Sequence, residues 1–393
     1  MKKIFCLMIA FMLLIFCAAA EEAAADTAEE NVLVATLRDE KIYMSDVEAY
    51  AYQLYSSGLI SSYTDYATAL EYLLKYNALP AVMMKEMGAE TVLGEEAYLQ
   101  AVEDAKVGYE AELKSYVEYF YGTDLTEEEF SGLYKEVENM YIEAGFGVDA
   151  YIEEYVTGEA FAKFFMEQTF EISDEEIEET FIEFAESDKE LFGNDIEMYE
   201  YYTSYMGYQP LYTPEGFRGI THILLTADEA LLDAYSAAKE TGDEAAIEKA
   251  ENDVIESLRE TIDLIYKSLE GGVEFESLIA EFGGDPGMQD EQNLANGYAV
   301  HKNSSTYVQE FTDGSFSEKM VKVGDVSDPV VTAYGVHILY YLRDVPSGYV
   351  ELDDMLKEDI RSYLTGMKQD ELLDKWLQDY GVEYAAEYAS LIG

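Results

Sequence analysis

Two of the three histidines in this chain lie in nearly the same local sequence, and this pair constrains the fold more than any other feature. Each opens a His-Ile-Leu run, at His222 and at His337, inside an apolar segment typical of a β-strand. Successive side chains of a strand point to opposite faces, so each histidine has a defined face. The match predicts two neighbouring strands that bring both imidazoles into one site. A lone histidine in a strand is more often a hydrogen-bonded core residue, so the surrounding sequence must decide.

The first 20 residues have the layout of a secretory signal peptide. Lys2 and Lys3 precede an apolar stretch that is too short to span a bilayer comfortably, and small residues suitable for cleavage end at Ala20. No later segment is long and apolar enough to span a membrane. We therefore expect an exported protein, extracellular or in the cell envelope, with residues 1–20 removed. Residues 21–31 are acidic and rich in alanine, which predicts a disordered leader.

Both cysteines of the chain, Cys6 and Cys17, fall in this signal segment. Cleavage after Ala20 would leave no thiol for a disulfide, a nucleophile or a metal ligand. Cys17 is an alternative site for a lipid anchor. The residue before it, Phe16, departs from the small residue that this signal requires, so we expect simple cleavage.

The net charge of −58 argues against two classes of partner. A chain this acidic repels nucleic acid and anionic membrane surfaces. Solubility alone explains the charge, although acidic helices could also bind cations weakly.

The rest of the sequence predicts an α+β fold with three parts. Residues 32–210 begin with a strand–turn–strand and continue as a mainly helical domain, with helix starts marked by capping boxes at Ser45, Thr126 and Ser173. Residues 206–219 contain prolines and glycines and predict a linker. Residues 217–346 mix strands and helices. Residues 347–393 carry an amphipathic helical pattern that is too short to fold alone and should pack on the first domain.

The strongest motif lies at the end of the mixed domain, in residues 323–338. Their sequence, VGDVSDPVVTAYGVHI, resembles the closing signature of the parvulin (rotamase) family of peptidyl-prolyl isomerases. That signature is G-D/E-x-S-x-P-V-x-T-x-x-G-x-H-I, and every fixed position is present. The opening His-Ile-Leu at His222 and a helix-ending turn at Asp285 also match the family, so the resemblance covers residues 219–344. The arrangement around it is similar to exported foldases of the SurA and PrsA type, in which a parvulin domain with a small antiparallel sheet is inserted into a helical chaperone domain.

The resemblance implies a catalytic site that needs no metal and no cofactor. In the family, two histidines form a hydrogen-bonded pair beside an acidic or thiol side chain. By resemblance His222 and His337 take that role, Asp285 is the acidic group, and Thr332 fixes the histidine tautomers. Asp285 alone would equally suit an ordinary turn before a proline.

Three aromatic residues are expected to line the proline pocket of such a domain. They are Tyr298, Tyr307 and Phe311, although the family commonly has Leu and Met at the first two positions. The chain between Phe311 and Gly324 is longer than usual, so Phe316 is an alternative to Phe311. The third histidine, His301, lies in a polar loop and is expected to be solvated.

The resemblance implies an exported peptidyl-prolyl cis–trans isomerase and chaperone that acts on unfolded or nascent secreted polypeptides with X-Pro bonds. Rotation about such a bond breaks no covalent bond, so an apolar pocket that favours the twisted amide is sufficient. Because the pocket residues are altered, a catalytically idle holdase that only binds unfolded clients stays open as the alternative. A more distant third is a structural surface protein with cation-loaded acidic helices. Neither a His-Glu-x-x-His metal motif nor a G-x-S-x-G elbow is present.

Overall fold

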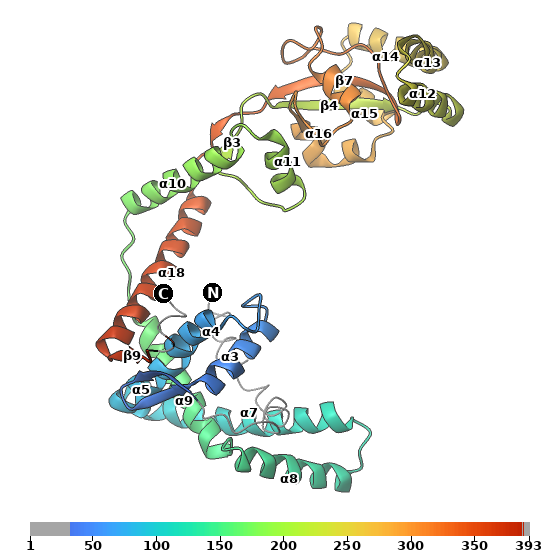
Figure 1. The fold of residues 1–393 in the computed structure, drawn as a ribbon. Coiled ribbons are helices and arrows are strands. Elements are labelled where there is room, and N and C mark those ends of the chain that lie inside the picture. Colours follow the sequence, from blue (N-terminus) through green and yellow to red (C-terminus); the bar gives the residue numbers. More distant parts are fainter. Residues whose placement is uncertain (1–31, 387, 389–393) are drawn as a thin grey trace. The chain divides into compact units, whose positions relative to one another are not determined.

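The structure is a computed structural model that describes residues 32–386 and residue 388 (Figure 1). The expected signal peptide, the acidic leader and both cysteines lie outside these residues. Contacts divide the chain into two compact units, of which the first comprises Met1–Ile172 with Ser362–Gly393 and the second comprises Ser173–Arg361. Helices predominate and the sheets are small and antiparallel, which confirms the predicted α+β class. Among the described residues, no helix is both long enough and apolar enough to cross a membrane.

The first unit contains a three-stranded antiparallel sheet built from both ends of the chain. Strand β1 (Leu33–Leu37) pairs with β2 (Glu40–Tyr43) on one side and with β9 (Val382–Tyr384) on the other. The tight turn between β1 and β2 holds Arg38 at φ 53°. The C-terminal segment therefore completes the sheet that the N-terminal segment begins.

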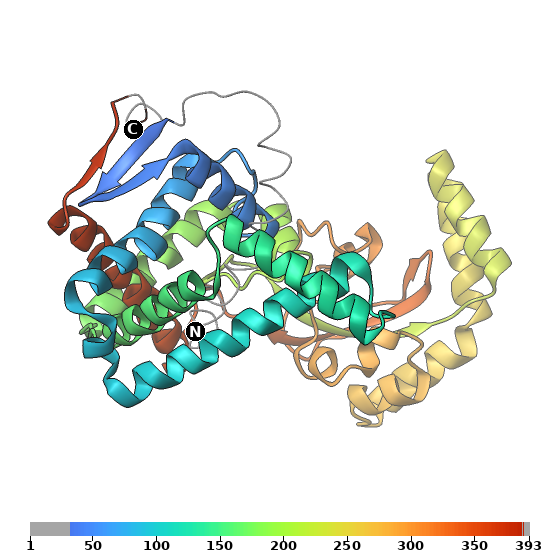
Figure 2. The ribbon, with the colours of Figure 1, turned by 90° about the horizontal axis from the view of Figure 1, so that it is seen from below.

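Helices make up the remainder of the first unit. They are α3 (Met44–Ser56), α4 (Tyr66–Leu73), the π-helix η1 (Leu74–Ala78), α5 (Leu79–Met87), α6 (Ala89–Leu93), α7 (Glu95–Tyr121), α8 (Glu127–Glu143), α9 (Val148–Met166) and part of α18 (Asp354–Asp379). The long helices α7 and α8 lie side by side as a hairpin (Figure 2). The helix start predicted at Thr126 follows the break between them, where Gly122 adopts φ 90°.

The last helix is joined to the first unit by apolar and ionic contacts. Trp376 of α18 packs against phenylalanines of α9, and its ring centroid lies 5.5 Å from that of Phe164. Lys75 is 2% exposed, and its ammonium group contacts Asp370 and Asp374 of α18 at 2.8 and 2.9 Å. A buried ammonium requires such partners because burial without them would disfavour its charge.

Two of the three predicted capping boxes are present. Thr126 begins α8 and Ser173 begins α10, and each exchanges hydrogen bonds with the glutamate three residues later. The prediction at Ser45 is wrong, because α3 begins directly after β2 and Ser45 already lies in its first turn. Here the backbone N–H of Tyr43 donates to the Asp46 carboxylate at 2.8 Å.

The second unit is organised around a four-stranded antiparallel sheet with the order β5-β4-β7-β6. Its elements are α10 (Asp174–Phe192), α11 (Ile196–Ser204), β3 (Tyr212–Thr213), β4 (Arg218–Leu225), α12 (Glu229–Thr241), α13 (Glu244–Ser257), α14 (Arg259–Glu270), α15 (Phe275–Phe282), the 3₁₀ turn η2 (Pro286–Gln289), α16 (Glu291–Asn296), β5 (Tyr298–Val300), α17 (Gln309–Ser315), β6 (Val330–Thr332), β7 (Gly335–Asp344), β8 (Gly348–Tyr349) and the start of α18.

The strand alternation separates two apolar clusters on opposite faces of this sheet. Ile223 and Ile338 are fully buried in a cluster with residues of α12 to α15. On the other face, Ile220 and Leu339 are fully buried in a cluster with Phe311 of α17. The second face is the one that carries both histidines, so it is the face on which a site can form.

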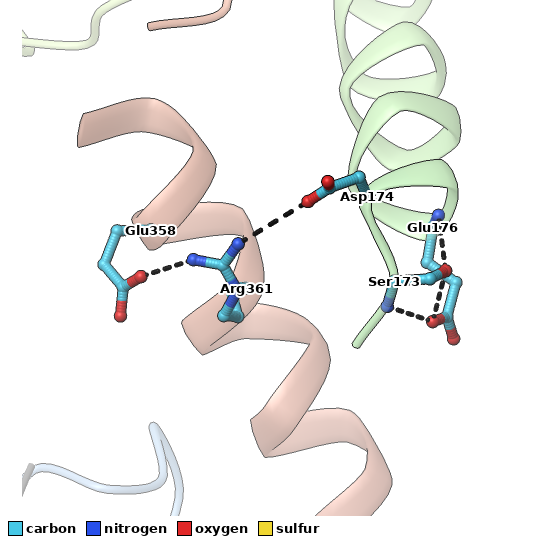
Figure 3. A network of polar contacts seen from close by, with 5 residues as sticks. All are labelled: Ser173, Asp174, Glu176, Glu358 and Arg361. Carbon is cyan, nitrogen blue, oxygen red and sulfur yellow. Dashed lines mark hydrogen bonds and ion pairs between the residues drawn. The ribbon is translucent and has the colours of Figure 1, made fainter. Parts of the chain in front are cut away.

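Helices α10 and α11 group with the second unit, whereas the sequence predicts a first domain that extends to residue 210. At the start of α10, Asp174 contacts Arg361 of α18 at 3.9 Å, and Arg361 also binds Glu358 at 2.6 Å (Figure 3). Farther along α10, the Asp188 carboxylate accepts a hydrogen bond from the backbone N–H of Leu211 at 2.6 Å. The Asp188 contact ties α10 to the segment that leads into the sheet, and the Asp174 contact ties its start to α18.

Candidate active site

The paired strands β4 and β7 place the two histidines side by side. His222 lies opposite Leu339, and His337 lies opposite Leu224, so the two imidazoles occupy one face of the sheet. Their ring centroids are 5.1 Å apart, and the side chains are 3% and 5% exposed. The predicted pair of neighbouring strands is therefore confirmed.

The turn after α15 brings Asp285 to His222. Oδ2 of Asp285 lies 3.0 Å from Nε2 of His222, and Oδ1 accepts a hydrogen bond from the backbone N–H of Gly287 at 3.0 Å. The hydrogen bond from His222 is the main reason why the pKa of the Asp285 carboxyl lies well below its usual range, and the bond from Gly287 acts in the same direction. Asp285 is thus a fixed negative charge at the edge of the site.

Tyr298 of β5 provides a third hydrogen bond to this carboxylate. Its hydroxyl donates to Oδ2 of Asp285 at 2.8 Å. Burial raises the pKa of Tyr298, and the neighbouring carboxylate raises it further. The resemblance predicts Tyr298 as a pocket wall, and no local pattern indicates that its hydroxyl would hold Asp285.

Gly287 is required by this arrangement and was not singled out from the sequence. A Cβ atom at Gly287 would lie 1.8 Å from the Tyr298 hydroxyl oxygen. The Gly-Asp-Pro-Gly turn was visible in the sequence, but its second glycine could be explained only once Tyr298 was known to lie against it.

Thr332, at the end of β6, binds the second histidine. Oγ1 of Thr332 lies 2.8 Å from Nε2 of His337, and it accepts a hydrogen bond from the backbone N–H of Tyr334 at 3.0 Å. The hairpin packs closely on the end of β4, since a Cβ at Gly335, where φ is 142°, would lie 2.2 Å from the carbonyl oxygen of Leu225. Two fixed residues of the closing motif, Thr332 and Gly335, therefore orient His337.

Burial, with a smaller contribution from His222, lowers the pKa of His337 to about 3, and Asp285 opposes the shift. His337 is therefore neutral at physiological pH. A neutral imidazole has one donor and one acceptor nitrogen, and the neighbours decide which is which. The Thr332 hydroxyl accepts from Tyr334 and shares a second hydrogen bond with Nε2 of His337, in which the ring tautomer decides which atom donates.

The resemblance implied a hydrogen bond between the two histidines, and the structure corrects this. Each Nε2 is bound elsewhere, to Asp285 or to Thr332, and both Nδ1 atoms are buried without a hydrogen-bond partner among the described residues. The ionised Asp285 carboxylate accepts the Nε2–H of His222. The two rings are in contact, with centroids 5.1 Å apart, and are not joined by a hydrogen bond.

Three aromatic rings form a column beside the histidines. Tyr307 stacks on Tyr298 at 5.7 Å and on Phe311 at 5.5 Å, with interplanar angles of 24° and 28°. Phe311 presents its ring at near right angles to His222 and His337, at 5.1 and 5.4 Å. All three predicted aromatic residues thus lie together, and we call them the aromatic column.

The alternative residue, Phe316, lies elsewhere on the same apolar cluster. Its ring stacks under the Arg218 guanidinium at 4.2 Å, and Phe311 rather than Phe316 faces the histidines. Met320, which the sequence did not indicate, is 1% exposed in the cluster that contains Phe311. A methionine in an irregular loop carries no periodic signal, so it could not have been found from spacing.

The third histidine differs from its prediction. His301 is 6% exposed rather than solvated, and its ring packs against Phe217 at 5.2 Å. Nδ1 of His301 accepts a hydrogen bond from the backbone N–H of Asn303 at 3.0 Å. The segment before β4 covers the ring, since a Cβ at Gly216 would lie 2.9 Å from Nε2 of His301.

Comparison with known proteins gives a family match for the region that holds this site. The model of the family described as Rotamase, a PPIC-type PPIASE domain, matches residues 222–343. A curated relative, the foldase protein PrsA of Geobacillus kaustophilus (strain HTA426), is 30% identical over 117 residues, which is 29% of this chain and 39% of the relative. The match thus spans well under half the length of that relative.

Solved structures with low identity cover more of the chain. The crystal structure of PrsA from Bacillus anthracis is 18% identical, covers 76% of this chain and 95% of its own, and has a TM-score of 0.21. A structure of the SurA-like chaperones PEB4 and Cj1289 of Campylobacter jejuni is 15% identical, covers 68% of this chain and 91% of its own, and has a TM-score of 0.28.

Proposed function

We propose that this chain, in which residues 222–343 form a PPIC-type rotamase domain, is a peptidyl-prolyl cis–trans isomerase and chaperone. The observation that carries the proposal is the joining of two buried histidines, one ionised aspartate and three stacked aromatic rings on a single sheet face. We propose catalytic roles for His222, Asp285, Thr332 and His337, with the aromatic column contacting the substrate proline. The 30% identity to a foldase over the same region supports this assignment.

Prolyl isomerisation requires a site that binds the twisted amide more strongly than the planar amide. A prolyl amide rotates over a barrier of about 18–20 kcal/mol because the planar form has resonance that the twisted form lacks. Stacked aromatic rings offer an apolar surface to the proline ring and exclude water from it. Such contacts accelerate rotation only where they bind the twisted amide more strongly than the planar one.

The charged and polar groups act on the amide as it twists. The fixed carboxylate of Asp285 disfavours charge separation of the planar, resonant amide, in which the carbonyl oxygen is partly negative. The neutral His337 adds no positive charge that would cancel this field. Hydrogen bonds from His222 and Tyr298 hold the carboxylate in place, so no reorganisation is needed during the rotation.

The client class and location follow as further proposals. We propose export through the signal-like segment at residues 1–20 and action on unfolded secreted polypeptides that contain X-Pro bonds. The helical first unit would hold such chains. The named foldase relative supports this view.

The test is an isomerisation assay on the chain from Glu21 onward with a short X-Pro peptide, by protease coupling or NMR exchange. We expect H222A, H337A and D285N each to lower kcat/KM about tenfold or more, because each removes part of the preorganised field. The matched control is Y334A, since Tyr334 lies on the same hairpin as Thr332 but is 64% exposed.

An outcome in which the two histidine variants retain wild-type kcat/KM would contradict the assigned site. The idle-holdase alternative predicts a different pattern, namely no isomerisation by the wild-type chain together with suppression of client aggregation. The tyrosines at positions 298 and 307 are the specific reason to keep this alternative, since they are larger than the Leu and Met expected there.

A further inference from the structure

Tyr307, the central residue of the aromatic column, follows a loop that is anchored by a residue outside the region that matches the rotamase family model. The loop comprises residues 301–306, and we call it the clasp loop. Glu200 of α11, which precedes residue 222, reaches the clasp loop and is 5% exposed. We propose that Glu200 is a positioning residue that fixes the aromatic column for substrate binding, an inference that rests on the proposed isomerase function.

The Glu200 carboxylate accepts four hydrogen bonds from three consecutive residues of the clasp loop. Oε1 accepts from the Ser304 hydroxyl at 2.5 Å. Oε2 accepts from the backbone N–H of Ser305 at 3.0 Å, and from the N–H and hydroxyl of Thr306 at 3.3 and 3.0 Å. A carboxylate with both oxygens satisfied in this way is a strong, directional anchor, because hydrogen bonds to a charged acceptor are shorter and stronger than neutral ones.

The anchor is one residue away from the column. Thr306 directly precedes Tyr307, so the backbone that Glu200 fixes is the backbone from which the central ring of the column projects. Tyr307 touches both other members of the column through its two stacked contacts. Burial, with a smaller contribution from the negative charge of Glu200, raises the pKa of Tyr307 to about 12.

A second contact holds the other end of the clasp loop against the same body. His301 accepts a hydrogen bond from Asn303 and packs on Phe217. Tyr199 of α11 also packs on Phe217, and their ring centroids are 5.3 Å apart. The fit is close, since a Cβ at Gly216 would lie 2.9 Å from Nε2 of His301. Helix α11, the segment before β4 and the clasp loop therefore form one packed assembly.

Loss of Glu200 should therefore affect substrate binding and the rate of isomerisation differently. Glu200 does not contact His222, His337 or Asp285, so its loss should leave the groups that act on the twisting amide in place. It should instead let the clasp loop and Tyr307 become mobile, and the substrate must then order them on binding. The cost should appear in KM or the peptide Kd, and kcat should change little.

The experiment compares E200A with D188A in the chain from Glu21 onward. Asp188 is a matched control because it is also 5% exposed, lies on the neighbouring helix α10, and accepts hydrogen bonds from Tyr208 and Leu211 rather than from the clasp loop. We expect E200A to raise KM and Kd for an X-Pro peptide about three- to tenfold, the ordering cost of one or two side chains, with kcat within about twofold of wild type. D188A should leave both constants near wild type.

Two further variants separate positioning from folding. E200Q keeps the shape and an acceptor oxygen, so most of the rise in KM seen in E200A should be absent from it. If E200A does not fold, the loop-side variant S304A/T306A removes two donors while leaving the carboxylate on its backbone partners, and a smaller rise in KM and Kd is expected. Amide hydrogen exchange at Ser305 and Thr306 should speed up in E200A and not in D188A.

The outcomes distinguish this inference from the proposed function. A wild-type chain that binds the peptide without isomerising it contradicts the proposed function, and the Kd ratio of E200A to wild type still tests Glu200. An unchanged Kd in folded E200A, or an equal change in D188A, overturns the positioning role. A fall in kcat with unchanged KM also overturns it, because that pattern belongs to a group acting on the reacting amide.

Discussion

His337 is a buried histidine that the fold keeps uncharged, and this makes protein stability depend on pH. Its pKa is lowered to about 3 in the folded chain, whereas an unfolded histidine has a pKa of about 6.5. Between these values the unfolded state binds the proton and the folded state does not, so stability falls as the pH falls. The stabilising contribution is complete above about pH 6.5.

We expect the free energy of unfolding of wild type to drop from pH 7 to pH 5, with His337 accounting for about 2 kcal/mol of the drop. Urea unfolding of wild type and H337L at both pH values measures this as the difference between their two drops. His301, whose pKa burial also lowers, stays in both proteins and cancels. Equal pH dependence in wild type and H337L would show that His337 is protonated in the folded chain at pH 5.

Residue-scale prediction from the sequence was good where strand geometry decided it. The alternation of side chains placed His222 and His337 on defined faces, and the structure puts both on one face. The closing motif supplied Thr332. Tyr298 as a donor to Asp285 and Glu200 as an anchor of the clasp loop could not be predicted, because both contacts join residues that no local pattern connects.

At the scale of elements, two helix starts can be tested independently because they lie in different units. Thr126 caps α8 in the first unit, and Ser173 caps α10 in the second. Each side chain accepts a hydrogen bond from a backbone N–H that has no partner within its helix. We expect T126A and S173A each to lower the free energy of unfolding of its own unit by about 1 kcal/mol.

Site-specific hydrogen exchange or proteolysis of each unit measures this effect. T126S is the conservative control, since a serine hydroxyl can keep the cap, and it should stay close to wild type. If T126A and S173A each destabilised both units equally, the two units would unfold as one, and the division seen in the contacts would have no energetic counterpart.

The capping boxes also show why some elements were predictable and others were not. At Thr126 and Ser173 a loop precedes the helix, so the capping residue is free to take the extended backbone that a cap requires. At Ser45 the preceding strand runs directly into the helix, and Tyr43 becomes the N-cap residue. A capping motif predicts a start only where the preceding chain leaves room for one.

On the scale of the whole molecule, the sequence indicated where the composition changes, but it did not indicate which helices belong to which compact unit. The prolines and glycines near residue 210 suggested a boundary, yet α10 and α11 group with the unit that follows them. Prolines and glycines show where the chain turns. Which body a helix joins depends on buried carboxylates such as Asp188 and Glu200, whose partners are distant in sequence.

The net charge of −58 gives the last prediction, which concerns the chain as a whole. Like charges in a compact chain repel each other, and salt shortens the range of this repulsion from about 30 Å at 0.01 M to about 8 Å at 0.15 M. We therefore expect the unfolding temperature to rise with NaCl over this range, as measured by thermal melting.

CaCl₂ at matched ionic strength separates screening from binding. Equal melting temperatures in the two salts would indicate screening alone, and a higher temperature in CaCl₂ would indicate the weak cation binding that acidic helices could provide. A melting temperature that falls with NaCl would contradict self-repulsion, and would mean that attractive ion pairs such as those of Lys75 outweigh it.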